Sequence, residues 1–145
     1  MTANNMNSLN AMLIKELGKA MNIVSDKTLA DMYDETGKFY TKGKPVVYKR
    51  TGALGDTPET TSITTSSFGN GGMVSFDAYL DTNHQYTSGD NPNMQQVLEL
   101  ANYGTPWTTA SGATAKPTLG KKGFWERAEK KMEKTLNRTL KKFFR

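Results

Sequence analysis

His84 is the chain's only histidine, so the positions that could support chemistry are few. It lies between Asp81 and Asp90 in a polar stretch, a set of side chains that a general base or a metal site could use. A general base also needs an orienting partner and a nucleophile held by a rigid scaffold, and this stretch supplies neither. We therefore interpret His84 as a solvated side chain. A small hydrolase is a third alternative, in which substitution of His84 would remove the activity.

Two further motifs in the same part of the chain are incomplete. Residues 81–92 begin with the oxygen ligands of a calcium loop, but Tyr86 stands where such loops need glycine and Pro92 where they need glutamate. The glycine-rich segment 69–72 lacks the Lys-Ser/Thr of a phosphate-binding loop, and a hairpin turn explains it. The chain also has no cysteine. We expect no cofactor, no metal site and no enzymatic activity.

Charge is divided among three segments of the chain. Residues 1–50 carry a net +3, residues 51–115 carry −6 without a single Lys or Arg, and residues 116–145 carry +8. A nucleic-acid-binding protein is more often basic throughout, whereas segregated charge favours head-to-tail contact between copies. We expect this contact to join an acidic and a basic set of side chains. The acidic set is Asp56, Glu59 and Asp77, and the basic set is Lys130, Lys134, Arg138 and Lys141.

Apolar periodicity predicts helices at both ends of the chain. Residues 7–24 repeat apolar side chains at three- and four-residue steps. Ser25 followed by Asp26 is typical of a new N-cap, which predicts a second, short helix that Gly37 ends. After Gly123 a long basic amphipathic helix is expected. Its apolar face consists of Phe124, Trp125, Ala128, Met132, Leu136, Leu140 and Phe143.

The middle of the chain predicts strands and loops. Residues 46–48 are expected to be extended, and residues 60–68 and 73–79 to pair as a hairpin whose Val74, Phe76 and Ala78 share one face. Residues 94–103 are compatible with a helix or a strand. Residues 81–93 and 105–122 are predicted to be long polar loops. Together these elements predict one α+β domain over residues 1–145, with the C-terminal helix packed on a small antiparallel sheet.

The basic C-terminal helix also supports an alternative function. Such helices can lie on anionic membranes or follow nucleic-acid phosphates, so a monomeric nucleic-acid- or membrane-surface-binding protein is the second hypothesis. In that case, deletion of residues 124–145 would abolish binding and leave residues 1–115 folded. The N-terminus lacks the basic and apolar blocks of a signal peptide. We therefore expect the protein to be made and used in the cytoplasm, or in a particle assembled there.

Two short motifs lie between these elements. A Tyr-Lys-Arg-Thr-Gly-Ala-Leu stretch at residues 48–54 follows the N-terminal helices, and Tyr-Gly-Thr at residues 103–105 precedes the second polar loop. This order resembles the tail-completion or neck proteins of tailed bacteriophages over most of residues 9–143. The chain departs from that family at residues 81–93, where it carries an extra polar loop. The matching positions are Tyr48, Arg50, Thr51, Gly52, Leu54, Tyr103, Gly104 and Thr105.

The motif residues suit a structural role rather than catalysis. Tyr48 and Leu54 can anchor a turn in the core, Gly52 permits a tight bend, and Arg50 can bond carbonyls or an acid. The resemblance implies a ring-forming subunit in the virion neck, made in the host cytoplasm. Its implied partners are further copies of itself, the portal, adaptor or head-closure proteins, and the tail terminator or tail tube proteins. DNA would pass through the ring without sequence-specific binding, and no membrane would be involved.

Overall fold

The computed structural model describes residues 5–43, 52–69, 71–83, 94–104, 108, 112 and 120–145. Its fold class is α+β, which confirms the prediction from sequence. The elements follow in the order α1 (Met6–Phe39), η1 (Ala53–Asp56), β1 (Pro58–Thr60), β2 (Thr64–Phe68), β3 (Gly71–Ser75), β4 (Ala78–Leu80), α2 (Met94–Tyr103) and α3 (Phe124–Phe143). Residues 94–103, for which sequence left helix or strand open, are helical.

The N-terminal region is one helix of 34 residues, so the predicted break at Ser25 and Asp26 was wrong. Ser25 is buried within α1, because it lies on the face that packs against the rest of the fold. An N-cap stabilises a helix by about 1 kcal/mol, which tertiary packing along a continuous helix readily outweighs. Gly37 does not end the helix either. Backbone N–H groups of Tyr40 and Thr41 close it two residues later, on the carbonyls of Gly37 and Lys38.

The predicted hairpin is confirmed as a long two-stranded ribbon. β2 pairs antiparallel with β3 from Thr64↔Ser75 to Phe68↔Gly71, and β1 pairs with β4. Three residues on one strand oppose two on the other between these pairings, which is the pattern of a β-bulge. Thr61 and Asp77 bridge the interruption, since Thr61 N–H donates to the Asp77 carbonyl at 2.9 Å and Asp77 N–H to Thr61 Oγ1 at 2.8 Å.

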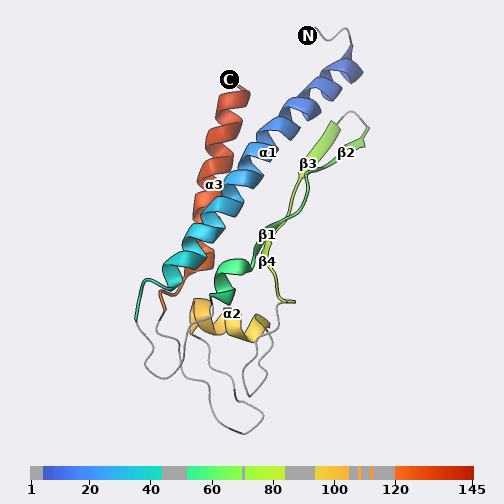
Figure 1. Ribbon diagram of the computed structural model, residues 1–145. Helices are drawn as coiled ribbons and strands as arrows, with labels where there is room; N and C mark the ends of the chain where they lie inside the picture. The colour runs from blue at the N-terminus through green and yellow to red at the C-terminus, as the bar shows by residue number, and fades with distance from the viewer. Residues whose placement is uncertain are drawn as a thin grey trace.

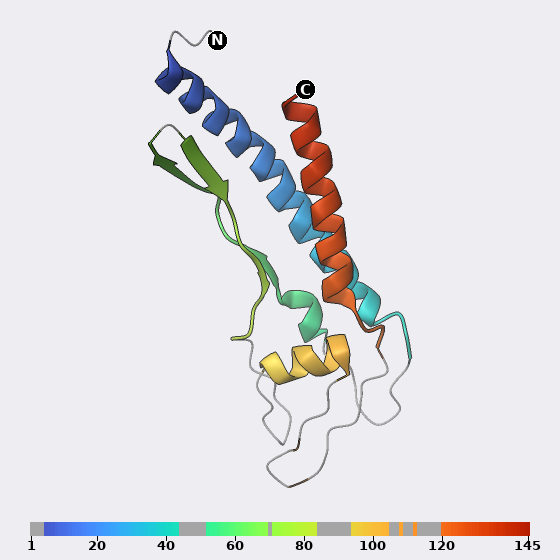
Figure 2. The same ribbon diagram turned by 180° about the vertical axis from the view of Figure 1, so that it is seen from behind.

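α1 lies between the β2–β3 hairpin and the C-terminal half of α3. Figures 1 and 2, which look from opposite sides, both place the hairpin along one flank of the N-terminal half of α1 and the end of α3 along the other. β3 approaches α1 closely at Gly72, where a Cβ would lie 2.3 Å from Ile14 Cδ1, so any larger residue there would require the Ile14 side chain to move. α3 packs mainly against α1, and the first turn of α3 lies beside β4.

The apolar core lies at the end of the molecule where α1 ends and α3 begins. Its buried side chains come from four elements and are Phe39, Leu54, Leu98, Ala101 and Phe124. Phe39 and Phe124 meet edge to face, with ring centroids 6.4 Å apart. Toward the opposite end, which holds both chain termini, α1 and α3 diverge (Figures 1 and 2). The fold therefore has one closed end and one open end.

Candidate functional site

The two motifs that carried the family resemblance fall partly outside the described residues. Tyr48, Arg50, Thr51 and Thr105 are outside them. Gly52 begins η1 with a positive φ of 84°, which suits glycine. Leu54 is buried in the core, and its N–H donates to Tyr40 Oη at 3.0 Å.

The second motif lies at the end of α2. Gly104 has a φ of 76°, and its N–H donates to the Leu100 carbonyl at 2.8 Å, so this glycine closes the helix. Tyr103 is largely exposed at 60% of its surface. The described motif positions therefore form helix ends and a core anchor rather than a cluster of reactive groups.

The three acidic residues expected at an interface are all exposed on the ribbon and its leading turn. Asp56 ends η1, Glu59 is exposed on β1, and Asp77 is exposed between β3 and β4. Glu59 accepts a hydrogen bond from Tyr79 Oη at 2.6 Å, and this bond raises the pKa of the tyrosine. Within the described part of the chain these three carboxylates make no ion pair.

The four basic residues expected at an interface form an exposed stripe on α3. Lys130, Lys134 and Arg138 follow one another at four-residue steps, and Lys141 extends the row by a further turn. Among the described residues none of the four makes an ion pair. The acidic residues and the basic stripe therefore lie on separate elements, the acids on η1 and the lower part of the ribbon and the bases on α3.

Other charges of α1 and α3 are used inside the molecule, which the sequence alone did not indicate. Glu35 on α1 is 2% exposed, and its carboxylate receives Arg127 Nε at 2.5 Å, Lys131 Nζ at 2.6 Å and Lys38 Nζ at 2.8 Å. Neighbouring Asp34 receives Lys131 at 2.6 Å and Lys38 at 2.7 Å. This cluster fastens α3 to the last turns of α1. The feature of the sequence that could have revealed this cluster is Glu35, which is spaced in step with the apolar residues of α1.

The cluster strongly favours the ionised carboxylates. Burial acts to raise the pKa of Glu35, but hydrogen bonds from Lys131, Lys38 and Arg127 outweigh it and lower the pKa to about 2. Hydrogen bonds from Lys131 and Lys38 also lower the pKa of Asp34 to about 2. The hydrogen bonds that Lys131 donates to Asp34 and, second, to Glu35 raise the pKa of Lys131. These groups keep fixed charges over the physiological pH range, so the cluster is structural.

Asn102 on α2 fixes the beginning of α3. Gly123 offers no side chain to cap the helix, so the Asn102 Oδ1 accepts the N–H of Trp125 at 3.0 Å in its place. Its Nδ2 donates to both carboxylate oxygens of Glu126, and its backbone carbonyl accepts the N–H of Gly123 at 2.9 Å. Sequence reasoning missed this cap because the two partners are more than twenty residues apart.

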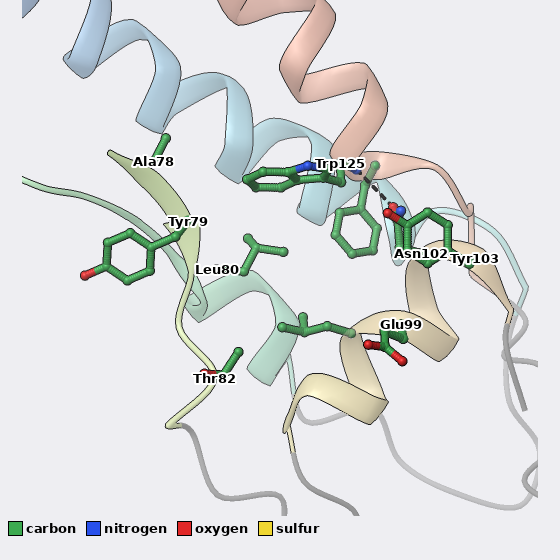
Figure 3. Close-up of a pocket in the computed structure, with 10 residues that line it drawn as sticks. Ala78, Tyr79, Leu80, Thr82, Glu99, Asn102, Tyr103 and Trp125 are labelled. Carbon is green, nitrogen blue, oxygen red and sulfur yellow. Dashed lines mark hydrogen bonds between the residues drawn. The ribbon is translucent and has the colours of Figure 1, made fainter. Parts of the chain in front are cut away.

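An open groove of about 400 Å³ lies between β4, α2 and the first turn of α3 (Figure 3). Leu80 points into it and the Trp125 indole lies across one side, whereas the Tyr79 hydroxyl points away. The lining is mostly apolar, and Asn102 is already engaged in capping α3. A mostly apolar lining of this kind suits contact with another apolar surface.

The described residues contain neither a metal-binding cluster nor a membrane-spanning helix. No group of three or more His, Asp or Glu side chains is placed to hold a metal ion in the part of the chain that the structure describes. No helix among the described residues is both long and apolar enough to cross a membrane. His84, considered above for catalysis, lies outside the described residues.

Comparison with protein families gives a match. The YomN family model matches residues 5–145, which is almost the whole chain. Searches of curated proteins and of solved structures found no match. YomN is a protein from a Bacillus prophage region. The chain therefore belongs to the YomN family and is phage-associated.

Proposed function

We propose that the protein is a structural, non-enzymatic subunit of a tailed-phage virion that assembles into a ring at the neck, between head and tail. Its partners would be neighbouring copies of itself, the portal, adaptor or head-closure proteins on one side, and the tail terminator or tail tube proteins on the other. DNA would pass through the ring without sequence-specific contacts. The subunit would be made in the host cytoplasm and reside in the virion.

One observation carries the proposal: exposed acids on η1 and the ribbon and exposed bases on α3, both without ion-pair partners among the described residues, occupy separate surfaces of the molecule. A cyclic ring needs a heterologous interface, in which one surface of each subunit meets a different surface of the next. Unpaired charges of opposite sign on separate surfaces meet that requirement. The family's phage association and the resemblance to neck proteins agree with it.

The magnitude of these charges defines what they can do. Single exposed ion pairs contribute only about 0–1 kcal/mol each, so the charges alone do not make a tight ring. Like charges brought together cost several kcal/mol, so the same residues strongly select the orientation of neighbours. The charges would therefore set polarity and salt dependence, while apolar contact would supply affinity.

Charge reversal tests the proposal. One variant changes Lys134 and Arg138 to Glu, and a second changes Glu59 and Asp77 to Lys. Every substituted side chain is exposed, so both variants should fold. Each variant alone should remain monomeric by light scattering, because the two substituted positions then have the same sign as the pair of charges that they are proposed to meet on the neighbour. An equimolar mixture should assemble, since each variant supplies the pair of charges that the other needs.

The mass of the mixture distinguishes a charge-matched ring from the alternatives. Multimers of the wild type and of the mixture, but not of either variant, would support a heterologous charge-matched ring. If the wild type and both variants are monomers that ignore purified portal–adaptor complex, the proposal is wrong. Loss of binding to DNA or to anionic liposomes by the Lys134/Arg138 variant, without any change in mass, would instead favour a monomeric nucleic-acid- or membrane-surface-binding protein.

A further inference from the structure

The open end of the molecule exposes large apolar side chains from α1. Leu13 is 45% exposed and Leu9 is 40% exposed. Leu13 lies 22 residues before Glu35, close to six helical turns, so it shares the face of α1 that meets α3 lower down. At the open end α3 has diverged from α1, and this face loses its cover (Figures 1 and 2). We name Leu9 and Leu13 the α1 stripe.

The hairpin carries a second apolar surface at the same end of the molecule. Phe68 is 63% exposed and Met73 is 54% exposed. The register places both on the face opposite Val74, which is buried, so they point away from α1. No charged residue lies between Glu59 and Asp77, so nothing on the hairpin opposes apolar contact. We name Phe68 and Met73 the hairpin face.

These two apolar surfaces are arranged like the charges. The α1 stripe lies on the flank of the basic α3, and the hairpin face lies on the flank of the acidic Glu59 and Asp77. In Figure 1 the hairpin is level with the N-terminal half of α1, and β1 and β4 lie lower, toward α3's first turns. A neighbour placed to match the charges would therefore bring its hairpin face to the α1 stripe.

We infer that the α1 stripe is the docking site for the hairpin face of a second copy of this chain. Charge selects this occupant. Two copies joined through their α1 stripes would bring their Lys134 and Arg138 side chains toward each other, which like-charge repulsion disfavours. Head-to-tail docking pairs these bases with the neighbour's Glu59 and Asp77 instead. The inference rests on the proposed ring and adds the apolar contact that would supply its affinity.

The absence of native cysteine allows a direct test by disulfide trapping. Full-length L13C is mixed with full-length M73C that carries a size tag, under mild oxidation, and crosslinks are read on a non-reducing gel. A disulfide needs Cα atoms within about 7 Å, so only close docking produces it. A second pair, L9C with F68C, covers a small offset in register. The matched control is Y33C with M73C, since Tyr33 is equally exposed on α1 at 47% but lies on another face.

The expected result is a tagged–untagged crosslink for L13C with M73C or for L9C with F68C. It should exceed the Tyr33 control by on the order of ten-fold, because docking raises the effective concentration of the two thiols. An L13C–L13C crosslink would overturn the inference in favour of paired helices. A multimeric mass with neither expected crosslink would overturn the docking inference alone. A monomeric mass without crosslinks, both alone and with purified portal–adaptor complex, would overturn both the docking and the ring.

Discussion

The two ends of this molecule use the same two helices in different ways. At the closed end, α1 and α3 bury Phe124 at 1% exposure and fasten Glu35 at 2% with three cations. At the open end the helices diverge, and Leu13 and Phe68 remain 45% and 63% exposed. At the closed end these side chains find their partners within the chain. The open end presents apolar surface that a stable monomer does not need.

The difference teaches how a small subunit can separate folding from assembly. Stability comes from the closed end, where side chains from α1, η1, α2 and α3 share one core. The open end is held mainly by the contact of β3 with α1 and contributes exposed surface. Substitutions at the two ends should therefore affect different measurements, and the following variants test that division.

Phe124→Ala should have the largest effect on stability. Removing a fully buried aromatic side chain from a core costs about 3–5 kcal/mol of unfolding free energy. The matched control is Phe68→Ala at the open end, which should change stability by less than about 0.5 kcal/mol because Phe68 is exposed. Urea denaturation followed by circular dichroism measures both. Equal losses for the two variants would break the comparison between the ends.

Glu35→Gln should come next, with a loss of about 2–3 kcal/mol. Breaking a buried ion pair costs more than that, but Arg127, Lys131 and Lys38 are each about one-third exposed and can turn toward water. Glu16→Gln, which breaks the exposed pair with Lys19, is the control and should cost less than about 0.5 kcal/mol. If Glu35→Gln left the free energy of unfolding unchanged, α3 would be held by apolar packing alone.

Acid should weaken the closed end through the same carboxylate. The folded pKa of Glu35, about 2, lies below its ordinary 4.5, so its stabilisation is present above pH 4.5 and is lost as pH falls toward 2. The loss should reach up to about 3 kcal/mol at low pH. Denaturation of the wild type and of Glu35→Gln at pH 7, 5, 4 and 3 checks this. The variant should show a shallower decline, and parallel curves would contradict it.

Asn102→Ala should have a smaller effect of about 1 kcal/mol, because it removes a cap from the start of α3. Tyr103→Ala provides the control at the adjacent, exposed position and should change stability by less than about 0.5 kcal/mol. Thermal melting detects the difference. If both variants melt like the wild type, Asn102 does not hold the junction of α2 and α3.

Leu13→Ser should have the smallest effect on folding and a large effect on assembly. Leu13 is exposed in the monomer, so unfolding free energy should stay within about 0.5 kcal/mol of the wild type. Its role in docking predicts loss of the multimer at concentrations where the wild type assembles. Ile23→Ser, at a similarly exposed α1 position, is the control and should assemble normally. Loss of stability without loss of assembly would reverse the assignment of the open end.

Periodic and local patterns predicted the elements that depend on them. Sequence was enough to predict the amphipathic helix α3, its start after Gly123 and the hairpin around Gly69. Each follows from side-chain spacing or glycine conformation. The break at Ser25 was wrong because a local cap preference lost to tertiary packing. The Glu35 cluster and the Asn102 cap were missed, since both join residues distant in sequence that only the fold brings together.

The presence of exposed charge could be predicted from sequence, but its geometry could not. Composition identified an acidic middle and a basic end, and the structure adds that the exposed acids lie on η1 and the ribbon and the exposed bases on α3. It also removes Arg127 and Lys131 from the available bases, because Glu35 and Asp34 engage them. The motif at residues 48–51 lies outside the described residues, so its role stays a prediction.

The most direct test of the central claim is the mass of the full-length protein by light scattering, in low and high salt, alone and with purified portal–adaptor complex. The account predicts a discrete multimer, or stoichiometric capture by the connector, that weakens as salt screens the flanking charges. A monomer whose mass ignores both salt and the connector, but increases with DNA or anionic liposomes, would contradict it.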